Sequence, residues 1–366
     1  MTQAGHEVHV VCPRGDRYDR SAYEYIDGVA IHRYPLRAAT GGVSGFLREY
    51  PSALWRSIRI TRKLGHFDVV HICNPPDLLW TVALLFKMRG SRVVFDQHDL
   101  CPELYLSRFE RGRDPLYYFV RLLERITYGV ADLVIATNES YAAVARGRGR
   151  VDSAQVAVVR SAPDLSKFSG GSPDPDLKGG TQHLLHFHGV MGPQDGVDYA
   201  LRALAELRKC RVDWKASFAG DGDVRPAMIS LAAELGLEEC VEFPGRVPDQ
   251  ELLNLMATAD LGLSPDPLNP LNDVSTMNKI LEYMAAGLPV VSFDLREARA
   301  SAGEAAVYVA PNDPTAFAGE IDRLLDDPDE RRSMGEEGLR RLERDLSWSR
   351  SAEALTEAYR TVLAPS

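Results

Sequence analysis

The chain of 366 residues is longer than one hydrophobic core usually supports, so we expect two domains. With 45% hydrophobic and 26% charged residues, its composition is that of an ordinary globular protein. No apolar run reaches the length of about 18 residues that marks a membrane-spanning helix, so the sequence predicts none.

The net charge of −10 is unevenly distributed along the chain. Residues 1–165 carry 22 Lys and Arg against 18 Asp and Glu, whereas the remainder carries 20 against 34. The basic charge of the N-terminal half is an indication of the kind of partner that this half binds. The five cysteines lack a CxxC pair, which fits reduced thiols in a cytoplasmic protein and argues against a Cys-based zinc site. They are Cys12, Cys73, Cys101, Cys210 and Cys240.

The first half of the chain alternates predicted strands and helices. Residues 1–4 predict the end of a helix that stops at Gly5, and residues 115–127 predict an amphipathic helix. Strands are predicted over residues 8–12, 25–36, 68–72, 92–95 and 131–137, the second of them a hairpin around Asp27-Gly28.

Residues 45–65 predict a basic amphipathic helix with a tryptophan. Its apolar positions at helical spacing are Phe46, Leu47, Tyr50, Leu54 and Ile58. Its cations lie elsewhere, at Arg48, Arg56, Arg59, Arg62 and Lys63. Such a helix can lie on an anionic membrane, and weak contact through residues 46–63 is one interpretation. The other is an ordinary surface helix packed on the sheet.

The stretch DQHDLCPELY, residues 96–105, follows a predicted strand end, where open α/β sheets place their ligands. Metal binding by His98 with Asp96 or Asp99 is conceivable, but the pattern of metal ligands is weak, so we predict no metal. Local turn and cap hydrogen bonds are an equal explanation for the acidic residues.

The second half begins after a stretch rich in Gly, Pro and Ser, residues 169–180, which predicts a hinge. A strand over residues 184–188 then leads into a turn with Gly189, Gly192 and Gly196, a pattern weakly diagnostic of phosphate binding. Another strand, over residues 214–219, ends in the turn Gly220-Asp221-Gly222-Asp223.

Residues 272–293 predict a helix, a stop and a buried strand. Ser275 or Thr276 can cap the helix, Gly287 can end it, and the apolar stripe is Met277, Ile280, Leu281, Met284 and Ala285. Asn278, Lys279 and Glu282 lie off this stripe, near the end of the helix that attracts anions. They can bind a phosphate and a sugar diol, or they can be part of a capped surface helix with one Lys–Glu pair.

The sequence of this stretch from Asn278, NKILEYMAAGLPVV, closely resembles the nucleotide-sugar-binding helix of the retaining glycosyltransferases of family 4. These enzymes have the GT-B fold. The most similar branch is that of bacterial amino-deoxysugar (fucosamine-type) transferases of surface polysaccharide synthesis. The resemblance covers nearly the whole chain and is strongest from Gly189 to Asn312.

The resemblance implies roles for individual residues. Glu282 matches the residue that binds the donor ribose, and Ser275, Thr276, Met277 and Asn278 match the helix start whose N–H groups hold the diphosphate. Lys279 is expected to face the diphosphate. The other donor-binding matches are Gly189, Asp195, Gly220, Asp221 and Arg246, the last lying in the segment that reads the base. In the first half, the resemblance makes His98 and Asp99 catalytic candidates beside Lys279.

Three positions depart from the family pattern. The Arg and Lys that usually follow Gly189 are replaced by Val190 and Asp195, and a usual acidic position is Val274, with Asp273 the nearest carboxylate. There are two interpretations of the lost cations. Either Lys279 and backbone N–H groups take over their role, as a feature of this branch, or the protein has lost its catalytic activity.

The expected fold class is α/β, as GT-B, with two doubly wound Rossmann-like domains facing a cleft. We expect an N-terminal acceptor-side domain over residues 1–165, a hinge over 166–182, a donor-binding domain over 183–345 and a returning helix over 346–366. In relatives, a strand and a glycine-rich loop come before the segment that corresponds to residues 1–13. We therefore expect the N-terminal domain to lack its first strand, and the natural gene to encode about 15–30 further residues.

The expected function is retaining transfer of a hexose or hexosamine from a nucleotide sugar to a carbohydrate or lipid-linked acceptor. The alternatives are a nucleotide-sugar epimerase of the same fold and a non-catalytic nucleotide-sugar-binding protein. We expect no cofactor, no nucleic-acid partner and a cytoplasmic location, with peripheral contact at the inner face of the cell membrane if the basic helix binds lipid.

Overall fold

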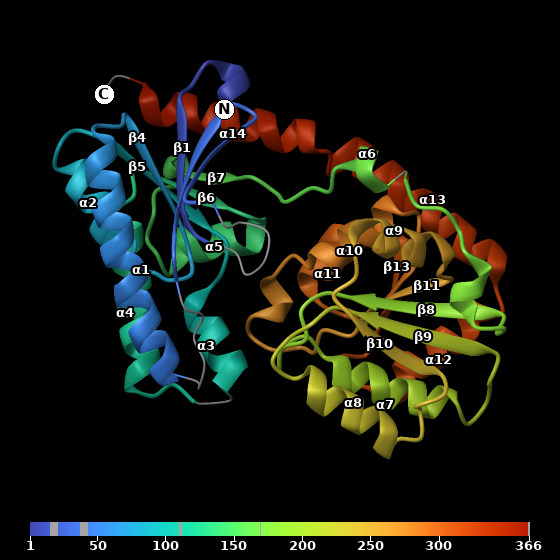
Figure 1. Cartoon of the computed structure of the whole chain (residues 1–366). Helices are drawn as coiled ribbons and strands as arrows, with labels where there is room; N and C mark the ends of the chain where they lie inside the picture. Colours follow the sequence, from blue (N-terminus) through green and yellow to red (C-terminus); the bar gives the residue numbers. More distant parts are fainter. Residues whose placement is uncertain (15–20, 37–42, 110–111, 169, 365–366) are drawn as a thin grey trace. The chain divides into compact units, whose positions relative to one another are not determined.

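The computed structural model describes residues 1–14, 21–36, 43–109, 112–168 and 170–364, with the backbone alone for residue 3 and residues 43–48 (Figure 1). The chain divides into two compact units. The first contains Met1–Pro102, Asp114–Val158 and Ala354–Ser366, and the second contains Glu103–Arg113 and Val159–Glu353. Each unit is built of β-strands and α-helices around parallel sheets, as expected.

The first unit holds most of the elements predicted for the first half of the chain. They are β1 (Val8–Pro13), β2 (Tyr23–Ile26), β3 (Val29–Tyr34), α1 (Val43–Leu64), β4 (Val69–Cys73), α2 (Trp80–Lys87), β5 (Arg92–Gln97), α4 (Pro115–Val130), β6 (Leu133–Ala136), α5 (Glu139–Gly147) and β7 (Val156–Val158). The division between the units falls within α3 (Cys101–Phe109) and α14 (Trp348–Leu363).

The predicted hairpin is confirmed, because β2 and β3 pair antiparallel across Asp27 and Gly28. Both turn residues have positive φ, 50° and 85°, the conformation that a tight two-residue hairpin needs. The basic helix is also confirmed as α1, although its predicted positions Phe46, Leu47 and Arg48 lie outside the described side chains.

The described strands of the first unit form two separate sheets, in the orders β1-β3-β2 and β4-β5-β6-β7. Within the described residues β1 pairs with β3 and β4 pairs with β5, and no described pair joins β1 to β4.

The second unit is a six-stranded parallel sheet in the order β10-β9-β8-β11-β12-β13. Its strands are β8 (His183–His188), β9 (Trp214–Ala219), β10 (Val241–Gly245), β11 (Leu261–Ser264), β12 (Val290–Phe293) and β13 (Ala306–Val309). In sequence order this is the 3-2-1-4-5-6 arrangement of the dinucleotide-binding fold, which reverses between β8 and β11. Ligands of such sheets bind at the carboxyl ends of the strands beside that reversal.

Helices cover both faces of this sheet (Figure 1). One side carries α7 (Val197–Leu207), α8 (Arg225–Glu234) and α12 (Pro314–Leu325), and the other carries α9 (Asp249–Thr258) and α10 (Asn278–Ala285). The remaining helices are α6 (Leu165–Phe168), α11 (Arg296–Ala302) and α13 (Pro328–Asp345). The main core of the second unit packs around its central strands, where Phe187, Phe218 and Phe293 are fully buried. A smaller cluster of Leu184, Ala219 and Leu255 lies beside it.

Among the described residues, the structure contains no helix that is both long and apolar enough to cross a membrane.

Candidate functional site

The strands on either side of the sheet reversal bring polar groups to one edge of the second unit. His188 ends β8 and is followed by Gly189, while Ser264 ends β11 and is followed two residues later by Asp266. The helix that follows β11 is α10, which carries Lys279 and Glu282. The predicted donor residues of the motif therefore lie at the position where this fold places its ligands.

The glycine-rich turn after β8 packs directly on the turn after β9. The Gly189 N–H donates to the carbonyl of Ala219 at 3.1 Å. Gly220 has a φ of 142°, and a Cβ added there would lie 1.9 Å from the carbonyl oxygen of Gly189. A Cβ at Gly196, where α7 begins, would lie 2.0 Å from the carbonyl oxygen of Pro265. Glycine at these positions lets backbones touch, which fixes the shape of the turn.

Asp195 and Asp221, the two acidic residues predicted to bind the sugar donor, close these turns. The Asp195 carboxylate accepts a hydrogen bond from the Gly192 N–H at 2.8 Å, and that of Asp221 accepts one from the Gly222 N–H at 2.9 Å. Burial raises the pKa of the Asp195 carboxyl, and the charge of Lys279 opposes that shift. Asp195 therefore has a structural contact within its own turn.

The start of α10 differs from the prediction. The helix begins at Asn278, and its N-cap is Met277, which makes no side-chain cap hydrogen bond. Predicting Ser275 or Thr276 as the cap was wrong, because the Ser275 hydroxyl donates instead to the Leu271 carbonyl at 2.8 Å. Thr276 and Met277 are partly buried, and Asn278 is exposed at the first helical position. The predicted end of the helix is confirmed, since Gly287 has a left-handed φ of 67°.

Lys279 is buried, although the sequence pattern placed it off the buried stripe of the helix. Only 10% of its side chain is exposed, and its Nζ donates to Asp266 Oδ1 at 2.7 Å. The ammonium also lies 4.9 Å from the centre of the Phe187 ring. Its Cε is 3.8 Å from the place where a Cβ on Gly189 would stand. The structure thus places Lys279 beneath the glycine-rich turn, as one half of a buried ion pair.

Asp266 is one residue of this site that the sequence pattern did not indicate. Its side chain is 1% exposed, and its second carboxylate oxygen accepts a hydrogen bond from Ser264 Oγ at 2.6 Å. The only signal was an acidic residue two positions after a buried strand, inside a proline-rich loop. Nothing local to that loop indicates that the carboxylate points inward.

Asn272 was also missed, and it joins the glycine-rich turn to the segment before α10. Its buried amide nitrogen donates to the carbonyls of Gln194 at 2.8 Å and Pro267 at 2.9 Å. Its neighbour Asp273 accepts a hydrogen bond from the Arg296 N–H at 3.0 Å, at the start of α11. Asp273 therefore caps a neighbouring helix.

Glu282 pairs with the residue at the end of β8. Its Oε2 lies 2.5 Å from His188 Nε2, and 36% of the Glu282 side chain is exposed against 7% for His188. Next to it, the fully buried Tyr283 hydroxyl donates to the carbonyls of His186 and Leu263. Glu282 is therefore held by His188 and still open to a ligand one turn from the helix start.

Arg246, predicted in the segment that reads the base, is exposed and directly follows β10. A second arginine holds the same strand end: Arg225 Nη2 donates to the Phe243 carbonyl at 2.7 Å.

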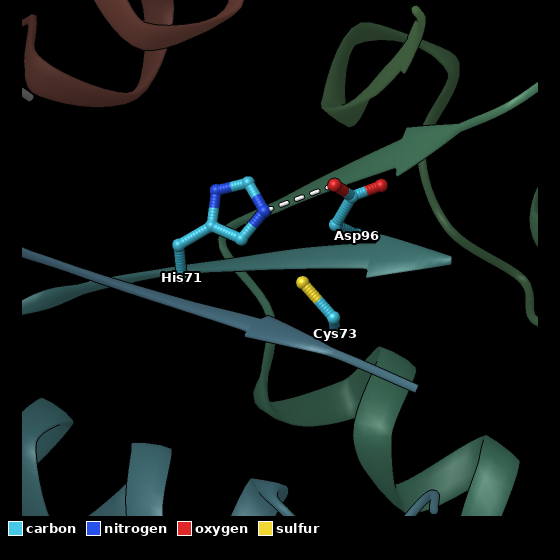
Figure 2. A group of neighbouring side chains, drawn as sticks. All are labelled: His71, Cys73 and Asp96. Atoms are coloured by element: carbon cyan, nitrogen blue, oxygen red, sulfur yellow. Dashed lines mark hydrogen bonds and ion pairs between the residues drawn. The ribbon is translucent and has the colours of Figure 1, made fainter. Parts of the chain in front are cut away.

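The predicted catalytic residues His98 and Asp99 belong to a separate cluster in the first unit. His98 Nε2 and His71 Nε2 each lie 3.1 Å from the same oxygen of Asp96, and Figure 2 shows His71, Cys73 and Asp96 converging. The hydrogen bond to Asp96 raises the pKa of His98 to about 10, so the imidazole is protonated at neutral pH. Burial raises the pKa of the Asp99 carboxyl.

Asn74 fixes the backbone of this cluster. Its amide oxygen accepts from the N–H groups of His98 at 2.9 Å and Asp99 at 3.1 Å, and its amide nitrogen donates to the Asp99 carbonyl. Held in this way and protonated, His98 can donate hydrogen bonds to a negative charge and stabilise it.

Comparison with known proteins places both halves of the chain in glycosyltransferase families. Residues 1–167 match the family model "Glycosyltransferase Family 4", and residues 182–327 match "Glycosyl transferases group 1". The D-inositol 3-phosphate glycosyltransferase of Frankia alni is 30% identical over 329 residues, which cover 82% of this chain and 76% of that protein.

Solved structures share the fold. Sucrose-phosphate synthase from Thermosynechococcus elongatus has a TM-score of 0.80 at 20% identity, covering 100% of this chain and 91% of that one. The Anabaena HepE protein, solved in complex with UDP-glucose, has a TM-score of 0.66 at 17% identity, with coverage of 95% and 99%.

Proposed function

This chain belongs to glycosyltransferase family 4, and from that premise we propose that it moves a hexose or hexosamine from a nucleotide-diphosphate sugar, with retention of configuration. The acceptor we propose is a carbohydrate or a lipid-linked carbohydrate in polysaccharide or glycoconjugate synthesis. A hexosamine donor would suit the amino-deoxysugar branch that α10 resembles. The observation that carries the proposal is the position of Lys279 beneath the glycine-rich turn at the sheet reversal.

The chemical demand of the reaction is stabilisation of the diphosphate as it leaves. An ammonium has three N–H donors, and the structure assigns one of those of Lys279 to Asp266. We propose that another donates to the donor diphosphate, together with backbone N–H groups at the start of α10. Because Lys279 is nearly covered, its charge is fixed in position before the donor binds, which avoids reorganisation during the reaction.

The test of this proposal measures donor consumption. The chain is incubated with UDP-, GDP- and dTDP-sugars and a panel of carbohydrate acceptors, and release of nucleoside diphosphate and formation of a glycosylated product are followed. Equal amounts of diphosphate and product support transfer. An isomerised sugar without product supports the epimerase, and a thermal shift without consumption supports the non-catalytic binder. The exposed Val190 and the internally bonded Asp195 are the observations that favour the binder.

We predict that transfer needs no added divalent cation. The proposed groups that stabilise the diphosphate are Lys279 and backbone N–H groups, which supply the charge that Mg²⁺ supplies in metal-dependent transfer. Turnover should therefore be unchanged in excess EDTA. Activity that EDTA abolishes and that magnesium or manganese restores would contradict this prediction.

We predict that Glu282→Ala weakens donor binding about tenfold to a hundredfold while the chain stays folded. A hydrogen bond to a charged group contributes about 1.5–3 kcal/mol, and Glu282 is open enough to accept from a ribose hydroxyl. Isothermal titration with the nucleoside diphosphate measures the loss. Glu234→Ala, an exposed position on α8, is the control. Donor affinity equal to that of the wild type would remove Glu282 from the site.

We propose peripheral membrane contact through α1, with a cytoplasmic location at the inner face of the membrane. Trp55, Ile58, Arg59 and Arg62 line a shallow surface groove of about 460 Å³ on this helix, and Trp55 is 57% exposed. The Arg59 guanidinium lies 5.3 Å from the Trp55 ring. An exposed aromatic ring flanked by cations suits an anionic lipid surface.

Reversing two of these charges should weaken binding to anionic vesicles at least about tenfold, because each cation near such a surface contributes about 1 kcal/mol. Vesicle sedimentation at low salt compares Arg59→Glu/Arg62→Glu with Arg202→Glu/Arg332→Glu, a matched pair in the second unit. Equal sedimentation with neutral and anionic vesicles would show that α1 is an ordinary surface helix.

A further inference from the structure

Four side chains that can bind a metal meet on one face of the sheet in the first unit. His71 and Cys73 alternate along β4 and therefore point to the same face. Cys73 is paired in register with Asp96 of β5, and His98 follows Asp96 by two residues. The ligand atoms of His71, Cys73 and Asp96 lie within 4.8 Å of one another. Figure 2 shows these three side chains gathered at the two neighbouring strands.

Both histidines of this cluster contact the same carboxylate oxygen. Asp96 Oδ2 lies 3.1 Å from His71 Nε2 and 3.1 Å from His98 Nε2. The Cys73 thiol contacts both imidazoles as well. On its other side, His71 Nδ1 lies 2.8 Å from the Tyr359 hydroxyl of α14, which fixes the ring and directs Nε2 at the carboxylate.

We infer that His71, Cys73, Asp96 and His98 bind one zinc ion. Zinc takes thiolate, imidazole and carboxylate ligands in a tetrahedron, whereas magnesium and calcium take oxygen ligands. This is a mixed site, so the absence of a CxxC pair does not count against it. Tyr359 has the place of an outer partner that orients a metal-binding histidine.

The geometry requires only a small adjustment. Zinc ligands lie about 2.0–2.3 Å from the metal, so their atoms stand about 3.3–3.8 Å apart in a tetrahedron. The widest separation among His71, Cys73 and Asp96 must therefore shrink by about 1 Å, which side-chain rotation can supply. The His98 side chain is 51% exposed, which leaves a path for the ion. On binding, the Cys73 thiol and the imidazoles release their protons to solvent.

The site goes beyond the proposed transfer, and its test needs neither donor nor turnover. The full chain, freed of metal, is titrated with Co²⁺ as a spectroscopic substitute and then with Zn²⁺. We expect one equivalent to produce a thiolate-to-cobalt charge-transfer band that zinc removes. Cys73→Ser should lose the band, Cys210→Ser should keep it, and Tyr359→Phe should weaken the affinity about tenfold or more. A band that survives Cys73→Ser, or no band in the wild type, would overturn the inference.

A second measurement on the unaltered chain avoids any failure of a variant to fold. Cys73 and Cys210 are both exposed, so iodoacetamide should alkylate both in the metal-free protein. One equivalent of zinc should protect Cys73 and leave Cys210 reactive, as mass spectrometry of the digested chain can show. Equal alkylation of Cys73 with and without zinc would also refute the site.

Discussion

Replacing Lys279 with methionine should lower transfer at least about 100-fold and reduce the free energy of unfolding by about 3–5 kcal/mol. The loss of activity follows from removing the ammonium proposed to bind the diphosphate. The loss of stability follows from Asp266, whose carboxylate is 1% exposed and would remain buried without its cation. Urea denaturation and a turnover assay on the same preparation measure both effects.

A double variant separates the two effects. In Lys279→Met/Asp266→Asn the buried charge is gone, and the Asn side-chain oxygen can still accept from Ser264 Oγ. This variant should recover most of the lost stability and none of the lost transfer. Lys215→Met is the control, since its partly exposed pair with Glu242 should contribute about 0–1 kcal/mol. Wild-type turnover in Lys279→Met would show that the buried pair is structural alone.

Gly220→Ala should lower the stability of the second unit by about 2–5 kcal/mol and weaken donor binding with it. The added methyl group would lie 1.9 Å from the Gly189 carbonyl oxygen, and the φ of 142° is one that alanine rarely adopts. The glycine-rich turn would have to move away from β9. Because Lys279 lies against that turn, the donor site would move with it.

The control for Gly220→Ala separates backbone strain from collision. Gly236 also has a positive φ, 71°, but a Cβ added there meets nothing within 4 Å. Gly236→Ala should therefore cost about 1–2 kcal/mol and leave donor affinity unchanged. Thermal unfolding and nucleotide titration compare the two variants. Equal losses at the two positions would mean that the contact between Gly220 and Gly189 does not fix the turn.

Much of the fold was predictable from local pattern. Residue patterns predicted the hairpin at Asp27-Gly28, and they predicted the strands now seen as β8, β9 and β12. Gly287 ends α10 as expected, because a left-handed helix end depends only on residues within one turn. The predicted start of α10 was wrong by one or two residues, since the Ser275 hydroxyl donates to the carbonyl of Leu271 and the N-cap is Met277.

The sequence by itself determined the residue types at the proposed donor site, their order and the helix that carries Lys279 and Glu282. The tertiary structure decided their partners. Asp266 reaches Lys279 only because β11 and α10 are brought together, and His188 reaches Glu282 across 94 residues of chain. The meeting of Cys73 with Asp96 likewise depends on the register between β4 and β5. The physical reason is that hydrophobic periodicity and helix capping depend on residues close together in the sequence. Burial and charge pairing depend on neighbours that are far away in the chain.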